Sequence, residues 1–142
     1  MISIGAIVGG PRLSNSPIGV AILSAMKTAT QVSGVSELET GPAINAVFYV
    51  PGDQGSPPWT GIRDSRFSRK RELLKVEIAV PYEVVSSSDA GRFVMESLHS
   101  ANRLACNVFE KKGIPFPFAE AEEFLDRLES AMRAENGDRD QI

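Results

Sequence analysis

His99, Asn102 and Cys106 have the residue types of a thiol hydrolase and lie close together in the sequence. In such an enzyme, a thiolate attacks, an imidazole acts as base and an amide orients the base. On one helix, the spacing from His99 to Cys106 corresponds to roughly 10 Å, whereas a base and its nucleophile must lie within roughly 3 Å. We therefore expect no catalytic residues and no enzyme, with Cys106 at the edge of the core and His99 half-exposed.

Metal and phosphate sites are also not indicated. One His and one Cys cannot supply a tetrahedral set of metal ligands unless carboxylates come from distant parts of the chain. The segment Gly9-Gly10-Pro11-Arg12 has the position of a phosphate loop, between a strand pattern and a helix pattern. It lacks the glycine spacing of both common phosphate-binding loops, so we expect a plain turn, no metal and no cofactor.

Residue types suited to binding concentrate between positions 51 and 75. A loop rich in proline and glycine carries the single tryptophan, Trp59, and leads into a basic segment that contains Arg63, Arg66 and Arg69. Trp and Arg dominate the energetic hot spots of protein interfaces. Two interpretations stay open: a solvated hairpin with Trp59 covering a sheet edge, or an anchor for a protein partner.

A second charged group consists of the acids after position 118, including Glu122, Glu123 and Asp126. One interpretation is a solvated helix face, in which acids near the helix N-terminus are favoured by the helix dipole. The other is an acidic surface for a basic partner. Paired carboxylates for acid–base catalysis need a cleft that shifts their pKa values, and the sequence indicates none.

The first elements that must position these residues form a strand–helix–strand pattern. Residues 2–8 and 43–50 are short apolar runs, bounded by Gly or Pro, that are typical of buried strands. Between them, Ser16 and Pro17 predict a helix start, because a hydroxyl caps free N–H groups and proline suits the first helical position. We expect this helix to end near Gly34.

The clearest strand is predicted at residues 73–81. Its apolar residues alternate with Lys75 and Glu77, which indicates one buried face and one solvated face. Residues 62–68 are the expected antiparallel hairpin partner, with the basic residues 69–71 at or near the turn.

Two helices are predicted after this hairpin. Residues 86–89 offer several capping side chains, and an apolar stripe at helical spacing follows them. Lys111 and Gly113 suit a helix C-terminus, because a cation complements the dipole and glycine adopts the left-handed cap. The last helix is expected from about Phe118.

The predicted order of strand, helix, three strands and two helices indicates an α+β fold. We expect a small, mainly antiparallel sheet of about four strands, with three helices packed on one face. A chain of 142 residues is long enough for one domain with its own core. We expect a single globular domain at residues 1–136 and a flexible C-terminal tail at residues 137–142.

Composition narrows the class of protein. The net charge of −3 disfavours a dedicated nucleic-acid binder. A single cysteine excludes an intramolecular disulfide and fits a reducing compartment. No apolar run approaches the ~20 residues that span a bilayer, and the apolar N-terminus lacks the basic region of a signal peptide. We expect a cytoplasmic protein without a nucleic-acid or membrane partner.

The segment Arg66-Phe67-Ser68-Arg69-Lys70, followed by the strand at residues 73–81 and a capped helix, resembles immunity proteins of bacterial polymorphic-toxin systems. The resemblance covers residues 45–128. It implies a small, single-domain, non-enzymatic protein that binds one toxin domain and occludes its active site or substrate surface. It carries over no catalytic residues, because this class has none in common.

The sequence therefore favours an inhibitor of a cognate toxin domain. The partner-binding residues that we select are Trp59, Arg63, Arg66 and Arg69 first, and Glu122, Glu123 and Asp126 second. Two other functions stay open: a small enzyme or ligand-binding domain, and a secretion chaperone or assembly subunit that dimerises. A homodimer also stays open, because an exposed sheet edge could pair with a second copy.

Overall fold

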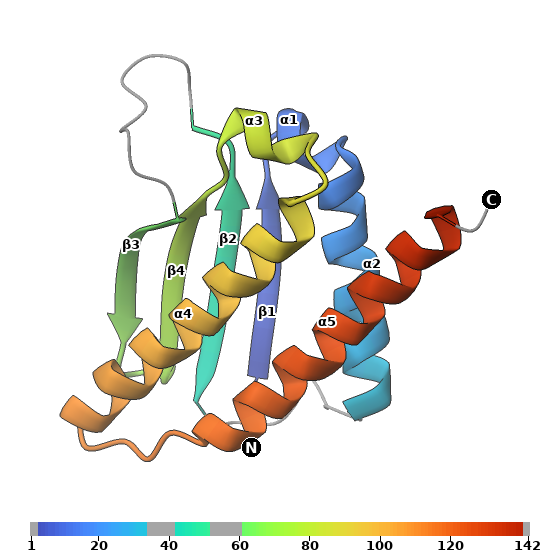
Figure 1. Ribbon diagram of the computed structural model, residues 1–142. Helices are drawn as coiled ribbons and strands as arrows, with labels where there is room; N and C mark the ends of the chain where they lie inside the picture. The colour runs from blue at the N-terminus through green and yellow to red at the C-terminus, as the bar shows by residue number, and fades with distance from the viewer. Residues whose placement is uncertain (1–2, 34–41, 52–60, 141–142) are drawn as a thin grey trace.

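A computed structural model describes residues 3–33, 42–51 and 61–140 of the chain. The predicted order of strand, helix, three strands and two helices is confirmed, and two short helices are added to it (Figure 1). The elements are β1 (Ser3–Gly9), α1 (Pro11–Ser14), α2 (Pro17–Ser33), β2 (Ala43–Tyr49), β3 (Gly61–Ser68), β4 (Leu73–Ala79), α3 (Tyr82–Val85), α4 (Ala90–Lys111) and α5 (Phe118–Asp140).

The four strands form one mixed sheet in the order β1-β2-β4-β3. The α+β class and the sheet of four strands are confirmed, but the expectation of a mainly antiparallel sheet is wrong. Strands β1, β2 and β4 are parallel, and among the described strands only β3 and β4 pair antiparallel. The reason is connectivity: α2 crosses over between β1 and β2, and β3 lies outside β4, which brings β4 back alongside β2 in the same direction.

The predicted hairpin of β3 and β4 is confirmed, with Phe67 opposite Leu74. The alternation on β4 is also confirmed, because Leu74, Val76 and Ile78 are buried while Lys75 is exposed. The turn between the strands ends at Glu72, whose φ of 49° lies in the left-handed region that favours glycine.

The start of α2 is held by Ser16, as its sequence predicts. The Ser16 Oγ accepts a hydrogen bond of 3.1 Å from the Gly19 N–H and donates one to the Leu13 carbonyl oxygen. Gly19 also allows the close approach of α1 to α2, since a Cβ atom there would lie 2.0 Å from the Leu13 oxygen. The segment after Gly10 is thus a turn and a single-turn helix that packs on α2.

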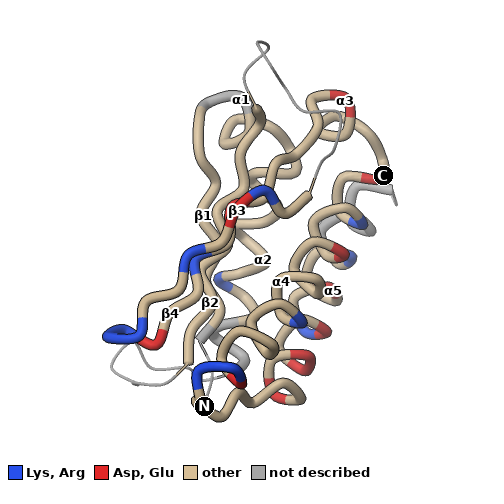
Figure 2. The backbone as a smooth tube through the Cα atoms, turned by 90° about the vertical axis from the view of Figure 1, so that its left-hand side faces the viewer, with Lys and Arg blue, Asp and Glu red and all other residues tan. Residues whose placement is uncertain are grey.

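The molecule has three layers (Figures 1 and 2). α2 packs on β1, α4 packs across β2, β4 and β3, and α5 packs on α2 and α4. All three long helices therefore lie on one side of the sheet. The largest fully buried side chains between the layers include Leu13, Ile22, Phe48, Leu98, Phe109 and Leu125.

The C-terminus of α4 agrees with the sequence prediction, whereas α5 extends further than predicted. α4 ends as predicted, with Gly113 in the left-handed region at a φ of 75°. α5 runs to Asp140, beyond the position 137 at which the sequence predicted the start of a flexible tail. Of the helices described, none combines the length and the apolar character needed to span a membrane.

Candidate functional site

One side of the sheet is covered by none of the described elements, as Figure 2 shows. Alternate residues of the four strands form this surface, which we call the open sheet face. Two rows of side chains cross it in register, one through Gly5, Asn45, Lys75 and Arg66, and the next through Ile7, Val47, Glu77 and Asp64. The first row is polar and basic, and the second is half apolar and half acidic.

Two of the predicted arginines lie together on this face. Arg63 is exposed, and its Nη1 donates a hydrogen bond of 3.5 Å to the Tyr49 hydroxyl. Arg66 lies opposite Lys75, and its Nε is 3.8 Å from the Asp64 carboxylate in a solvent-exposed pair. Exposed pairs of this kind contribute little to stability. Both guanidinium groups are therefore positioned by the sheet and accessible to a partner.

Arg69 does not join them. It lies in the β3–β4 turn, and its Nη2 donates a hydrogen bond of 3.2 Å to the carbonyl oxygen of Lys112 at the end of α4. This contact links the hairpin to the helix. Trp59 lies outside the described residues.

The predicted acids lie on α5, on the far side of the helical layer from the open sheet face (Figure 2). Glu123 and Asp126 are exposed, whereas Glu122 is half-buried against His99. Arg63 and Arg66 are thus on the opposite side of the molecule from Glu123 and Asp126. They cannot belong to one compact interface.

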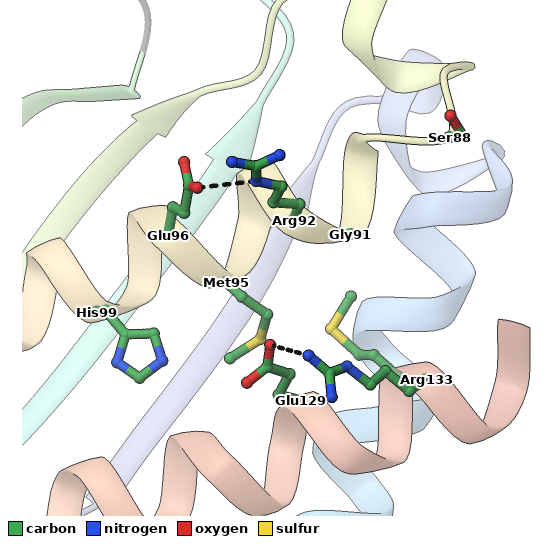
Figure 3. Close-up of a pocket in the computed structure, with 9 residues that line it drawn as sticks. Ser88, Gly91, Arg92, Met95, Glu96, His99, Glu129 and Arg133 are labelled. Carbon is green, nitrogen blue, oxygen red and sulfur yellow. Dashed lines mark hydrogen bonds and ion pairs between the residues drawn. The ribbon is translucent and has the colours of Figure 1, made fainter.

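A groove of about 410 Å³ lies between α4 and α5 (Figure 3). Met95 and Met132 are buried along it, and two ion pairs at 3.1 Å, Arg92–Glu96 and Arg133–Glu129, lie at its rim. Its lining consists of Ser88, Gly91, Arg92, Met95, Glu96, His99, Glu129, Met132 and Arg133. Charged side chains from both helices therefore surround an apolar floor.

His99 projects from α4 toward α5 at one end of this groove (Figure 3). Its Nδ1 lies 2.6 Å from Glu122 Oε2. Its ring also lies near Asp126 and Glu129, and one possible ligand atom from each of these three residues falls within 4.8 Å of the others. A histidine and two carboxylates can hold a metal ion.

The sequence predicts no metal site, because carboxylate ligands would have to come from distant parts of the chain. The carboxylates do come from a distant part of the chain, because α5 brings its acids beside His99. A signal was present: Glu122, Asp126 and Glu129 are spaced by four and three residues, which places them on one helix face.

The residue types of a thiol hydrolase are not assembled into a catalytic group. His99 bonds to Glu122, whereas the Cys106 thiol donates to Glu110 Oε1 at 3.4 Å. Burial raises the pKa of the Cys106 thiol, and the adjacent Glu110 carboxylate raises it further. Asn102 is fully buried, and its side-chain atoms have no hydrogen-bond partner among the described residues.

The fold and these two surfaces define the chain as an α+β protein with a mixed sheet covered on one face. Comparison with family models, with curated proteins and with solved structures gives no significant match.

Proposed function

We propose that this chain is a binding protein that recognises another protein through its open sheet face. The observation that carries the proposal is that the described elements cover only one face of a sheet that contains three parallel strands. Parallel sheets are normally covered on both faces. The open sheet face is thus a surface that a partner could cover.

The chemistry of the face favours a partner with exposed carboxylates. Arg63, Arg66 and Lys75 present three cations on adjacent strands, which outnumber the two carboxylates in the second row of the face. Tyr49 supplies an aromatic ring with a hydroxyl. Strand residues have a fixed backbone, so little backbone entropy is lost when a partner binds. Charge complementarity of this kind speeds capture and selects among partners.

The area of the face indicates how far the contact extends. Four strands of about seven residues give a projected area of roughly 450 Å², about half of the ~800 Å² per partner in a typical stable complex. A stable partner would therefore also cover neighbouring surface, and the basic turn after β3, with exposed Lys70 and Arg71, is adjacent.

The proposed partner is a toxin domain, which the chain inhibits by occluding its active site or substrate surface. The resemblance of residues 45–128 to immunity proteins supports this choice. A rigid, charged, solvent-facing sheet also fits an inhibitor that binds a folded target.

The test is co-expression with the C-terminal toxin domain encoded by the gene immediately upstream, with growth and co-purification scored together. We expect the chain to rescue growth and to co-elute as a stable complex. The double variant Arg66→Ala, Lys75→Ala should weaken the complex at least tenfold. The matched control Arg103→Ala, Lys111→Ala removes two exposed cations from α4 and should leave it unchanged.

Two outcomes contradict the proposal. A harmless neighbour domain, or one that never co-purifies, removes the inhibitor function. A complex that survives the sheet variant but is lost with Glu123→Lys on α5 would place the interface on the opposite side of the molecule.

A further inference from the structure

We propose that His99, Asp126 and Glu129 form a binding site for a divalent transition-metal ion, with Zn²⁺ as its probe. One ligand atom from each residue lies within 4.8 Å of the other two. Metal–ligand bonds of about 2.0–2.2 Å place neighbouring ligands roughly 3–4 Å apart. Small side-chain rotations, which the exposed Asp126 can make, would therefore close the site.

The orientation of His99 is an independent observation in favour of this site. Its Nδ1 lies 2.6 Å from Glu122 Oε2, and the two side chains are only 24% and 27% exposed. Because an ionised carboxylate only accepts hydrogen bonds, we assign the proton to Nδ1, which leaves the Nε2 lone pair for a ligand. A carboxylate that holds the far nitrogen of a metal-binding histidine is a common outer-shell arrangement, which fixes the ring and makes it a stronger ligand.

The donor set indicates the class of metal. One imidazole nitrogen with two carboxylates suits Zn²⁺, Co²⁺ or Ni²⁺, whereas Mg²⁺ and Ca²⁺ prefer complete sets of oxygen ligands. Two carboxylates also balance the charge of a divalent ion. Three protein ligands leave a further position for water or for a ligand atom from a partner.

Arg133 works against metal binding at this site. Its Nη2 lies 3.1 Å from Glu129 Oε1, and its side chain is largely exposed. This pair occupies one oxygen of Glu129, and the nearby cation repels a metal ion. Removal of the Arg133 charge should therefore strengthen metal binding severalfold. Arg92→Gln, which removes the other exposed cation of the groove, is the matched control.

The test is calorimetric titration of the tag-free full chain with Zn²⁺, and with Co²⁺ to record its visible absorption. We expect one equivalent to bind at micromolar concentration. Asp126→Asn and His99→Gln should each weaken binding at least tenfold, and Glu122→Gln, which alters only the orienting contact, by about 10-fold to 100-fold. Glu123→Gln, an exposed acid of the same helix, should have no effect.

The controls separate this site from unspecific binding. A thiolate is a strong zinc ligand, and Cys106 lies elsewhere on α4. Cys106→Ser should therefore leave the affinity unchanged if zinc binds at the proposed site and not at the thiol. Asp126 is exposed, so its variant should keep the fold, which circular dichroism verifies. Absence of binding, or equal affinity for Asp126→Asn and Glu123→Gln, would overturn the proposal. The result is independent of the toxin complex, since the two sites lie on opposite sides of the molecule.

Discussion

The Arg69 guanidinium donates a hydrogen bond of 3.2 Å to the carbonyl oxygen of Lys112, at the end of α4. The two residues are 43 positions apart in the chain. The last carbonyl groups of a helix have no partner within the helix and carry the negative end of its dipole. Arg69 supplies both a donor and a positive charge at that point. The β3–β4 turn and the C-terminus of α4 are thereby connected.

Arg69→Ala should therefore act on stability and hardly on partner binding. We expect the free energy of unfolding to fall by about 0.5–1 kcal/mol, the net value of one exposed hydrogen bond to a charged donor. Urea denaturation measures it, with Lys70→Ala in the same turn as control. A tenfold loss of toxin affinity with unchanged stability would contradict this prediction and would indicate that Arg69 contacts the partner.

Gly19→Ala should destabilise the protein, although alanine is the better helix former by about 1 kcal/mol. The new Cβ would lie 2.0 Å from the Leu13 carbonyl oxygen, so α1 and α2 must separate. Such overpacking costs about 1–3 kcal/mol. Thermal unfolding should show a lowered Tm, whereas Val20→Ala at the exposed neighbouring position should change it little. A Tm at or above the wild-type value would contradict this close approach.

Glu72→Gly should stabilise the protein. Glu72 is the one residue other than glycine with positive φ among those described, at 49°, and the left-handed conformation costs an L-residue about 1–2 kcal/mol. Glycine avoids this cost but loses more backbone entropy on folding, so we expect a net gain of about 0.5–1 kcal/mol. Arg71→Gly, which has no strain to relieve, should lower the urea midpoint. Equal effects of the two variants would contradict the prediction.

Asn102→Leu should raise stability. The amide is fully buried on α4, without a hydrogen-bond partner among the described residues, and such a group costs about 1–3 kcal/mol. A leucine of similar size removes that cost and adds apolar contact. The exposed Asn107 on the same helix, changed to Leu, is the control and should be near neutral in chemical denaturation. A loss of stability in Asn102→Leu would contradict the prediction.

Alkylation of Cys106 should be slow at neutral pH and should accelerate only at alkaline pH. Burial and then Glu110 raise the thiol pKa, and a raised pKa lowers the fraction of reactive thiolate at a given pH. Glu110→Gln removes the carboxylate charge, so the pKa should fall and the rate with iodoacetamide at pH 8 should rise severalfold. Glu123→Gln is the control. An unchanged rate would mean that burial alone determines the thiol reactivity.

Much of the fold could be predicted from local patterns. Alternation of apolar residues on β4 identified its buried face, and Ser16 with Pro17 identified the start of α2, because both signals depend on neighbouring residues alone. The direction of the strands could not be predicted. A strand with one buried face has the same pattern in a parallel or an antiparallel pair, and the pairing of β2 with β4 depends on where β3 lies.

The candidate metal site shows the same limit. In the sequence, His99 and the acids of α5 are separate features, and no metal site is predicted from them. Whether they meet depends on how α4 and α5 are aligned, which is determined by packing of buried residues such as Leu98 and Leu125. The hydrogen bond of Arg69 to Lys112 could not be predicted either, because it links segments far apart in the chain.

The mixed sheet also determines the order in which the chain can fold. The β3–β4 hairpin closes a short loop. The parallel pairs instead join residues far apart in the sequence, Ser3 with Ala43 and Ala43 with Leu73. Short loops close at lower entropic cost and lead to faster pairing. During synthesis, β1 and β2 leave the ribosome before β4 exists, and two strands alone are only marginally stable in water. We therefore expect β1 and β2 to remain unstructured until the β3–β4 hairpin has formed and β2 can pair with β4.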